Sequence, residues 1–360
     1  MISDRLLNEV VCVNAECRAA GAPHLNLREG LLVCPRCGRT YRLVDNAYVD
    51  LMPPAEGAHE SLYVSHEGEF EATLDYKRIG PPVLGAGVRQ RVIRRMLKPT
   101  RTDKLIELGC GNGKFVYWNR KLVDWAVGID PVPLFANEAI SEIDLAMADA
   151  RALPFDDAAF TAALSIDVLE HLPLPDFKLY LNEAHRVVAP GGRFFIFSNT
   201  REGSRLDFIV RTTRRLSRWL GERGVLDDSR DRLRKSDHVK AVETYPQLEA
   251  VLNECGWRVE KVVFWNGLFQ SLIENLLVKL GESLVRKVRR SRSKTTAGVS
   301  EQSAKGEDAL RSSMRTTLAS RGWTYGAMRL LTELMWLDLV LFGKWRAGPY
   351  FVLAVREDLP

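Results

Sequence analysis

Four cysteines near the N-terminus are arranged as two pairs, Cys12 with Cys17 and Cys34 with Cys37. This paired spacing is typical of a tetrahedral zinc site in which every ligand is a thiolate. Four protein ligands close the coordination shell, so the metal would stabilise the fold and would not catalyse. Four incidental cysteines are the alternative interpretation, and His24 is a competing ligand. The sequence therefore predicts a small structural zinc module.

A second group of residues lies where an expected strand turns into an expected helix, in the glycine-rich segment 107–113. Glycine allows the backbone to turn sharply and to approach a ligand closely. The pyrophosphate of a dinucleotide could occupy such a turn. However, Gly109, Gly111 and Gly113 lack the last interval of the dinucleotide motif, and Glu107 would repel a phosphate. A carboxylate at this position suits an amino group or a sulfonium.

Two further acids end the next two expected strands. Asp130 lies about 20 residues after the first strand, where an acid can accept hydrogen bonds from both ribose hydroxyls. Asp149, followed by Ala150, ends the third strand and can reach an adenine amino group. Each acid alone is more often a turn residue or a helix cap. Because ligands bind beyond the carboxyl ends of parallel strands, the acids and glycines together predict one nucleoside-binding site.

The segments that position these residues alternate between strand-like and helix-like patterns. Strands are expected at 104–108, 125–130, 143–148, 160–166, 192–198, 257–265 and 349–356, and helices at 88–97, 175–188 and 245–254. Such alternation predicts an α/β fold with a parallel sheet and helices on both faces.

Five segments of this region resemble the successive motifs of class I S-adenosylmethionine-dependent methyltransferases, in the subgroup that modifies small molecules and lipids. They are residues 107–113, 128–130, 148–155, 167–172 and 186–192. The resemblance implies S-adenosylmethionine as cofactor. It also implies a Rossmann-like seven-stranded sheet of order 3-2-1-4-5-7-6, with the last strand antiparallel and a helical insertion between strands six and seven.

The resemblance also implies roles for individual residues. Glu107 and the three glycines would surround the methionine part of the cofactor, Asp130 the ribose, and Asp149 with Ala150 the adenine, and Ser165 is included in this cofactor-binding set. A base is needed when the acceptor is a hydroxyl, and His171 and His238 are the candidates. For both histidines a hydrogen-bonded structural role is the alternative.

Residues 34–41 and 44–52 resemble the zinc ribbon of Trm112-like proteins, which bind and support methyltransferases as separate subunits. The resemblance implies the same partnership fused into one chain. Ribosomal-RNA guanine methyltransferases also begin with a zinc module, but their second ligand pair usually includes a histidine, which this sequence lacks. An RNA substrate is therefore the less favoured interpretation.

The chain is expected to divide into five segments. They are a zinc ribbon at 1–53, a connector and helix at 54–100, a methyltransferase core at 101–266 with an arginine-rich cover at 200–240, a helical insertion at 267–345 with a disordered loop at about 290–313, and a terminal strand at 346–360.

The net charge and the distribution of apolar residues indicate which binding partners to expect. A net charge of +5 on 360 residues does not by itself indicate a nucleic-acid-binding protein. The absence of a secretory signal and of a long apolar run predicts a cytoplasmic protein. The apolar stretches 267–290 and 325–342, the first ending in a basic run, predict peripheral contact with the inner face of a membrane. Packing on the domain or on a second copy in a homodimer is the alternative.

These observations lead to one main hypothesis: the protein methylates a small-molecule or lipid-linked acceptor, with an oxygen atom of the acceptor as the favoured position. The alternative is an rRNA or tRNA base methyltransferase that binds RNA through the zinc ribbon and the arginine-rich segments. A non-catalytic scaffold is a third interpretation, and the intact set of Glu107, glycines and Asp130 argues against it.

Overall fold

The computed structural model describes residues 2–52, 77–198, 202–204, 206–226, 241–281, 283 and 322–357. Several sequence predictions fall outside the described residues. They are His238, the loop at 290–313, most of the connector before residue 77 and the second half of the arginine-rich cover.

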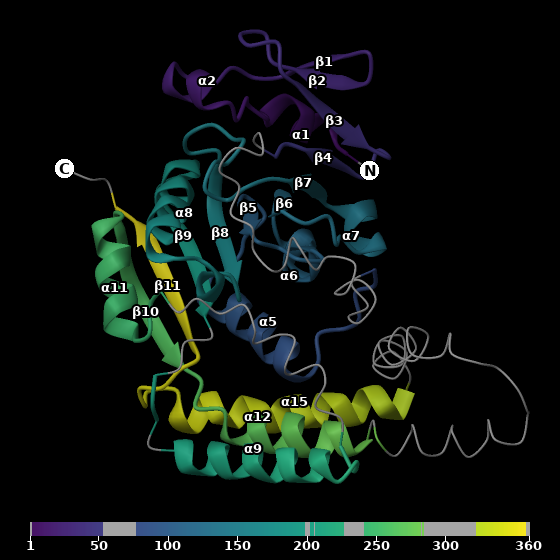
Figure 1. The fold of residues 1–360 in the computed structure, drawn as a ribbon, viewed down its shortest axis with the longest axis vertical. Helices are drawn as coiled ribbons and strands as arrows, with labels where there is room; N and C mark the ends of the chain where they lie inside the picture. The colour runs from purple at the N-terminus through teal and green to yellow at the C-terminus, as the bar shows by residue number, and fades with distance from the viewer. Residues whose placement is uncertain are drawn as a thin grey trace, which may run out of the picture.

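One mixed sheet runs through the described part of the chain (Figure 1). Its core strands are β5 (Lys104–Leu108), β6 (Trp125–Asp130), β7 (Asp144–Met147), β8 (Phe160–Ile166), β9 (Val188–Ser198), β10 (Trp257–Phe264) and β11 (Tyr350–Arg356). They lie in the order β7-β6-β5-β8-β9-β11-β10, and β11 is antiparallel to both of its neighbours. Counted from β5, this is the predicted order 3-2-1-4-5-7-6.

Helices cover both faces of this sheet, as the α/β pattern predicts. The residues of β6 are all buried, because apolar cores lie on both sides of it. One core contains residues of α5 (Leu84–Met96), α6 (Lys114–Asn119) and α7 (Asn137–Glu142). The other contains residues of α8 (Leu174–Val187) and α11 (Tyr245–Glu254). Two short 3-10 helices, η1 (Arg120–Leu122) and η2 (Leu169–His171), lie in the connections after α6 and β8.

The cysteine module extends the same sheet. It consists of α1 (Asp4–Glu9), α2 (Ala15–Ala19), β1 (Asn26–Arg28), β2 (Leu31–Val33), β3 (Thr40–Val44) and β4 (Tyr48–Asp50). Strand β4 pairs in parallel with β7, with Val49 opposite Ala146. The Leu51 N–H donates to the Met147 carbonyl at 2.8 Å and continues this pairing. The module is therefore joined to the edge of the core sheet by backbone hydrogen bonds.

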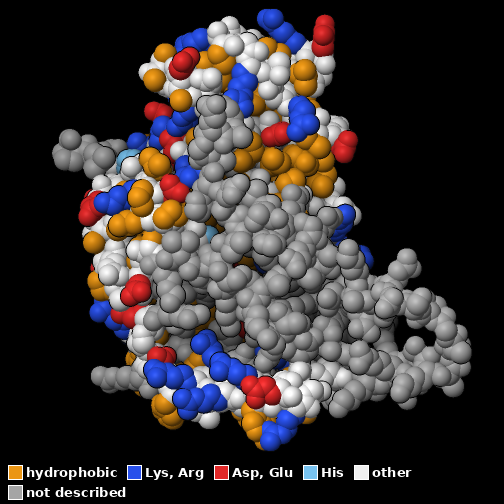
Figure 2. Space-filling view, viewed as in Figure 1, with side chains coloured by type: hydrophobic (Ala, Val, Ile, Leu, Met, Phe, Trp, Pro, Cys, Tyr) orange, Lys and Arg blue, Asp and Glu red, His pale blue; other side chains and the backbone are white. Residues whose placement is uncertain are grey.

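A stack of helices lies at the opposite end of the molecule from the cysteine module (Figure 1). It is formed by α15 (Gly322–Phe342), then α12 (Leu268–Leu272) with the π-helix η3 (Ile273–Val278), and outermost α9 (Asp207–Glu222). Helix α15 contacts α5, and α12 contacts both α15 and α9. In the space-filling view, basic side chains gather along this end (Figure 2).

Two sequence expectations about this stack were incomplete. The segment 200–240 lacks clean apolar periodicity, yet it contains the regular helix α9. The periodicity is weak because the buried positions of α9 carry Thr213 and Ser217. The stretch 267–290 was expected to be one amphipathic helix. Its described part is a short α-helix that changes into a π-helix at Ile273.

A buried carboxylate, that of Asp338 on α15, ties the stack together. Asp338 accepts hydrogen bonds from the backbone N–H groups of Phe269 at 2.9 Å and Gln270 at 3.0 Å, at the start of α12. It also accepts one from Trp265 Nε1 at 3.3 Å, just after β10. One side chain therefore fixes the positions of three segments.

We expect Asp338→Ala to lower the free energy of unfolding by about 3–5 kcal/mol, because three buried donors lose a charged acceptor. Urea denaturation monitored by circular dichroism measures this change. The matched control is Glu333→Ala on the same helix, whose exposed carboxylate pairs only with Arg91 among the contacts of the described residues. This control should change stability by less than about 0.5 kcal/mol. Equal effects of the two substitutions would contradict the role of Asp338.

Candidate cofactor and metal sites

The glycine-rich turn follows β5 and begins α6. Gly109, Gly111 and Gly113 all have positive φ angles, of 74°, 54° and 81°. A Cβ on Gly109 would lie 2.5 Å from Val168 Cγ2, so the turn packs against the segment after β8 there. A Cβ on Gly111 would meet no atom within 4 Å. The turn is therefore closed on the protein side and open at Gly111, which is the side a ligand can approach.

Asp130, at the carboxyl end of β6, holds this turn. Its Oδ2 accepts a hydrogen bond from the Gly111 N–H at 2.7 Å, and its Oδ1 accepts one from the Val132 N–H at 3.0 Å. Burial raises the pKa of Asp130 to about 6, against the pull of these two backbone donors. The carboxylate is thus placed at the strand end where the sequence predicted a ribose partner.

Glu107 lies beneath the turn and is fully buried. Its Oε2 accepts a hydrogen bond from the Val116 N–H in α6 at 2.7 Å. Its Oε1 has no hydrogen-bond partner among the described residues. Burial raises the pKa of Glu107 to about 8. A donor that carries positive charge would stabilise the ionised form of this carboxylate, so the residues present fit a ligand with an ammonium group.

The raised pKa of Glu107 predicts how stability depends on pH. The unfolded chain releases this proton near pH 4.5, whereas the folded chain keeps it up to about pH 8. The free energy of unfolding should therefore fall as pH rises through this range, by up to about 5 kcal/mol in total, and then level off. Glu107→Gln cannot titrate and should lose this slope between pH 7 and 8, above the pKa of Asp130. Urea midpoints at pH 7, 7.5 and 8 measure the difference, and equal slopes for both proteins would contradict it.

Asp149 lies just beyond the carboxyl end of β7, as expected, but it already has a partner. Arg151 Nη2 donates to Asp149 Oδ2 at 2.7 Å, and Arg151 Nε donates to Asp149 Oδ1 at 3.0 Å. The Arg151 guanidinium also reaches Asp176 at 2.9 Å. Ala150 is half-buried beside this ion pair, and Ser165 is fully buried on β8.

The segment after β8 brings further polar groups to the same edge of the sheet. His171 ends η2 and is half-buried, three residues after Val168, which packs on the glycine turn. Asp167 has a positive φ of 58° and forms an ion pair with Arg89 of α5 at 3.0 Å. Arg89 could not be predicted from the sequence, because α5 also carries Arg91, Arg94 and Arg95 and no local pattern distinguishes Arg89 from them.

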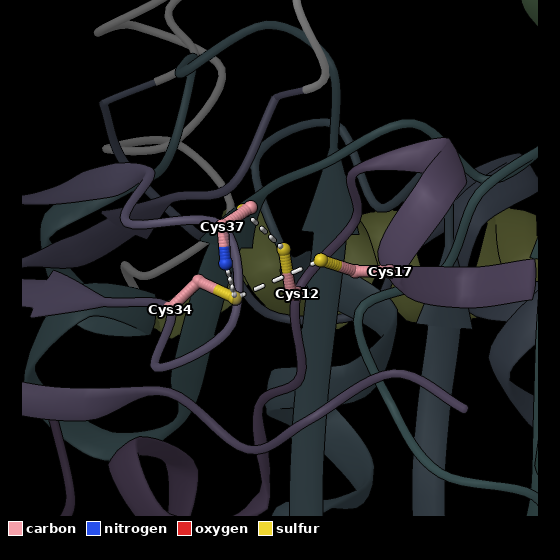
Figure 3. Close-up of side chains that lie close together, drawn as sticks. All are labelled: Cys12, Cys17, Cys34 and Cys37. Atoms are coloured by element: carbon pink, nitrogen blue, oxygen red, sulfur yellow. Dashed lines mark hydrogen bonds between the residues drawn. The ribbon is translucent and has the colours of Figure 1, made fainter. Parts of the chain in front are cut away.

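The four predicted metal ligands lie together (Figure 3). The sulfur atoms of Cys12, Cys17, Cys34 and Cys37 are all within 4.8 Å of one another. The Cys12–Cys37 and Cys17–Cys34 sulfur pairs are both 3.8 Å apart. Tetrahedral zinc with Zn–S bonds of about 2.3 Å has sulfur–sulfur edges of about 3.8 Å, so these positions fit a zinc ion. The distances are too long for disulfide bonds.

Hydrogen-bond donors favour the thiolate of Cys34, whereas burial raises the pKa of Cys12 and of Cys17. Burial raises the pKa of Cys34, but the backbone N–H groups of Cys37 and Arg36 outweigh it and lower the value to about 7. The Tyr41 hydroxyl lies 3.2 Å from Cys12 Sγ, inside the module. These contacts resemble the outer hydrogen bonds that orient metal ligands. His24 pairs instead with Asp156 at 2.8 Å.

The glycine turn and the acids lie in a segment that is similar to a known protein family. Residues 106–196 match the family described as "Methyltransferase domain". A tRNA U34 carboxymethyltransferase of Saccharophagus degradans is 23% identical over 187 residues, which cover 49% of this chain and 52% of that protein. A chloroplastic tocopherol O-methyltransferase of Arabidopsis thaliana is 30% identical over 146 residues, which cover 38% and 39% of the two chains. The matches thus span about half or less of these curated relatives.

Solved structures resemble the chain over a larger share of its length. Haemonchus contortus phosphoethanolamine N-methyltransferase 2, in complex with phosphomonomethylethanolamine and S-adenosylhomocysteine, is 14% identical with a TM-score of 0.45. The match covers 82% of this chain and 59% of that chain. Residues 106–196 therefore match a methyltransferase domain, and the strands lie in the order that the resemblance in the sequence implied.

Proposed function

We propose that the protein transfers the methyl group of S-adenosylmethionine to a small-molecule or lipid-linked acceptor, at oxygen. The observation that carries this proposal is the open glycine turn at Gly111, held by Asp130 and lying above the unused acceptor of Glu107. S-adenosylmethionine has an ammonium group for the unpartnered Oε1 of Glu107. It also has two ribose hydroxyls, which Asp130 can accept in addition to its two backbone donors, because a carboxylate has about four acceptor positions. When bound, it supplies an electrophilic methyl group.

The residues of the chain then have separate roles. Gly109, Gly111 and Gly113 let the backbone follow the methionine part of the cofactor. Asp130 orients the ribose, and Asp149 with Ala150 lies where the adenine would end. Asp149 can accept a further hydrogen bond beside Arg151, because a carboxylate has about four acceptor positions. Ser165 contributes to the floor of the site.

Methyl transfer depends mainly on placing the nucleophile of the acceptor in line with the methyl group, and less on a catalytic side chain. For a hydroxyl acceptor, a base increases the rate, and His171 lies after β8 at the required edge of the sheet. His238, the second candidate, lies outside the described residues. A variant His171→Gln should slow transfer to a hydroxyl while leaving cofactor affinity unchanged.

The four cysteines are proposed to hold one structural Zn²⁺. Four thiolates leave no open coordination position, so zinc would stabilise the ribbon and its junction with β7. The Trm112-like resemblance suggests that the ribbon supports the methyltransferase domain within one chain, as the β4–β7 pairing would allow.

Apolar surface on α15 supports a hydrophobic acceptor. Helix α15 exposes Trp323, Leu330, Leu334 and Leu341, which recur at intervals of seven and four residues and so share one face. We include in this proposal a cytoplasmic protein that contacts the inner face of a membrane peripherally, through the regions 267–290 and 325–342. A homodimer through α15 is the alternative. None of the helices among the described residues is long and apolar enough to cross a bilayer.

A base of rRNA or tRNA is the second candidate acceptor, and the similarity to a protein named as a tRNA U34 carboxymethyltransferase favours it. One experiment distinguishes the two candidate acceptors. The purified chain and methyl-labelled S-adenosylmethionine are incubated with a membrane-lipid extract or with total RNA. Label in the lipid or small-molecule fraction supports the proposal, and label only in RNA rejects it. Asp130→Ala, which should not bind the donor, is the control for non-enzymatic transfer.

A further inference from the structure

Helix α9 divides its apolar side chains between its inner and outer sides. Its two buried residues, Thr213 and Ser217, face the neighbouring helices, and Ile209, Val210 and Leu220 are half-buried. Its largest apolar side chains point outward: Phe208 is 66% exposed, Trp219 is 49% exposed and Leu216 is 43% exposed. A soluble helix normally buries its apolar face and exposes its polar one. Large apolar groups exposed on one helix indicate a partner on its outer side.

The inner side of α9 is already occupied. The Thr213 hydroxyl is hydrogen-bonded to the Ser271 hydroxyl of α12. The Lys279 ammonium donates to the Ser217 hydroxyl at 3.5 Å. These contacts fix α9 on α12 and η3 with its aromatic side outward. Rotation of α9 about its axis cannot bury Phe208 and Trp219 without breaking them.

The outer side of α9 is also strongly basic. Arg211, Arg214, Arg215 and Arg218 are all exposed, and Arg223 follows the helix with its guanidinium 3.5 Å from the centre of the Trp219 ring. The helix and its end contain only two acids, Asp207 and Glu222. Figure 2 shows blue and orange side chains side by side at the end of the molecule where α9 runs in Figure 1.

Apolar and basic side chains lie together on one face of α9. Phe208, Arg211, Arg215 and Trp219 follow one another at intervals of three or four residues, so they lie along a single stripe. Such a stripe is suited to an interface where the apolar groups enter an acyl region and the cations meet anionic headgroups. A nucleic acid would neutralise the arginines but would leave Leu216 in water.

We propose that the outer face of α9 docks on an anionic lipid surface. The occupant is a bilayer with negatively charged headgroups: its charge complements the arginines, and Phe208, Leu216 and Trp219 enter the boundary between headgroups and acyl chains. Helix α9 follows the carboxyl end of β9, so docking would turn the candidate site toward the membrane. This surface is distinct from the apolar stretches 267–290 and 325–342, and docking does not depend on methyl transfer.

Co-sedimentation of the full chain with lipid vesicles tests the proposal. We expect binding to vesicles of phosphatidylcholine with 30% phosphatidylglycerol, weakening as salt rises, and little binding to phosphatidylcholine alone. Phe208→Ala with Trp219→Ala should lower the partition coefficient at least about tenfold, because both side chains leave the acyl boundary. Arg211→Gln with Arg215→Gln should lower it about tenfold or more at low salt and much less at high salt.

Matched substitutions on the cysteine module serve as controls. Leu27 is 55% exposed and Arg28 is exposed on β1, far from α9, so Leu27→Ala with Arg28→Gln removes similar groups and should leave vesicle binding unchanged. All replaced side chains are exposed, so far-UV circular dichroism and the urea midpoint should change little. Absence of binding to anionic vesicles, or equal losses in the α9 and control variants, would overturn the proposal. Tight, α9-dependent binding to total tRNA without vesicle binding would overturn it in favour of RNA.

Discussion

Asp130→Ala is expected to weaken the binding of S-adenosylhomocysteine at least about 100-fold. The ligand would lose the hydrogen bonds from its two ribose hydroxyls to the carboxylate. Each bond to a charged acceptor contributes about 1.5–3 kcal/mol, and every 1.4 kcal/mol corresponds to a tenfold change in affinity. The substitution also frees the Gly111 N–H, which Asp130 holds at 2.7 Å, so the turn loses its position as well as its ligand partner. Isothermal titration calorimetry with S-adenosylhomocysteine measures affinity without turnover.

The pH dependence of the same titration provides a second test. Burial raises the pKa of Asp130 to about 6, so the wild-type chain should lose affinity as pH falls through this value. Below it the protonated carboxyl is a poorer acceptor for two hydroxyls.

Asp144→Ala is the matched control. Asp144 is a buried acid of the neighbouring strand β7, but it lies at the amino end of that strand. It accepts hydrogen bonds from the Ser3 hydroxyl at 2.6 Å and from Trp125 Nε1 at 2.7 Å. Its loss should lower the melting temperature and change the affinity for S-adenosylhomocysteine by less than twofold. If Asp130→Ala bound the ligand as tightly as Asp144→Ala, the cofactor site would lie elsewhere.

The parts of the site predicted from sequence are those fixed by local pattern. Apolar runs that end in glycine or aspartate locate the strand ends, and the topology of parallel sheets brings these ends to one edge. Glu107 and Asp130 could therefore be predicted to lie near one another. The ion pairs of Arg151 with Asp149 and Asp176 could not, because the second of them depends on how α8 packs beside the strand end.

Two features of the fold depend on contacts that leave no local signal. Strand β4 has three residues, and its pairing with β7 joins segments almost a hundred residues apart. Helix α9 was missed because its buried side carries hydroxyl groups, whereas apolar periodicity is what predicts a helix. Both are cases in which tertiary contacts, and not the apolar pattern, determine the local structure.

Removal of the metal is expected to have the largest effect on stability. One equivalent of zinc should co-purify with the chain, and Cys34→Ser should abolish it, since structural zinc sites of this type contribute about 10–16 kcal/mol of apparent binding free energy. Because β4 and Leu51 are hydrogen-bonded to β7, loss of the ribbon also exposes the edge of the core sheet. We expect a melting temperature lower by at least about 10 °C and rapid proteolysis within residues 1–52. Metal analysis and limited proteolysis measure these effects.

Cys255→Ser separates the loss of metal from the loss of a buried thiol. Cys255 is buried at the end of α11 and is not part of the cysteine cluster, so this variant should keep its zinc and its resistance to proteolysis. The affinity for S-adenosylhomocysteine should fall far less in Cys34→Ser than in Asp130→Ala, because the ribbon joins the sheet at β7, two strands away from the glycine turn after β5. A Cys34→Ser chain that kept a full equivalent of zinc would show that the four sulfur atoms do not share one ion. A variant that lost zinc without any change in stability would show that the ion does not support the sheet edge.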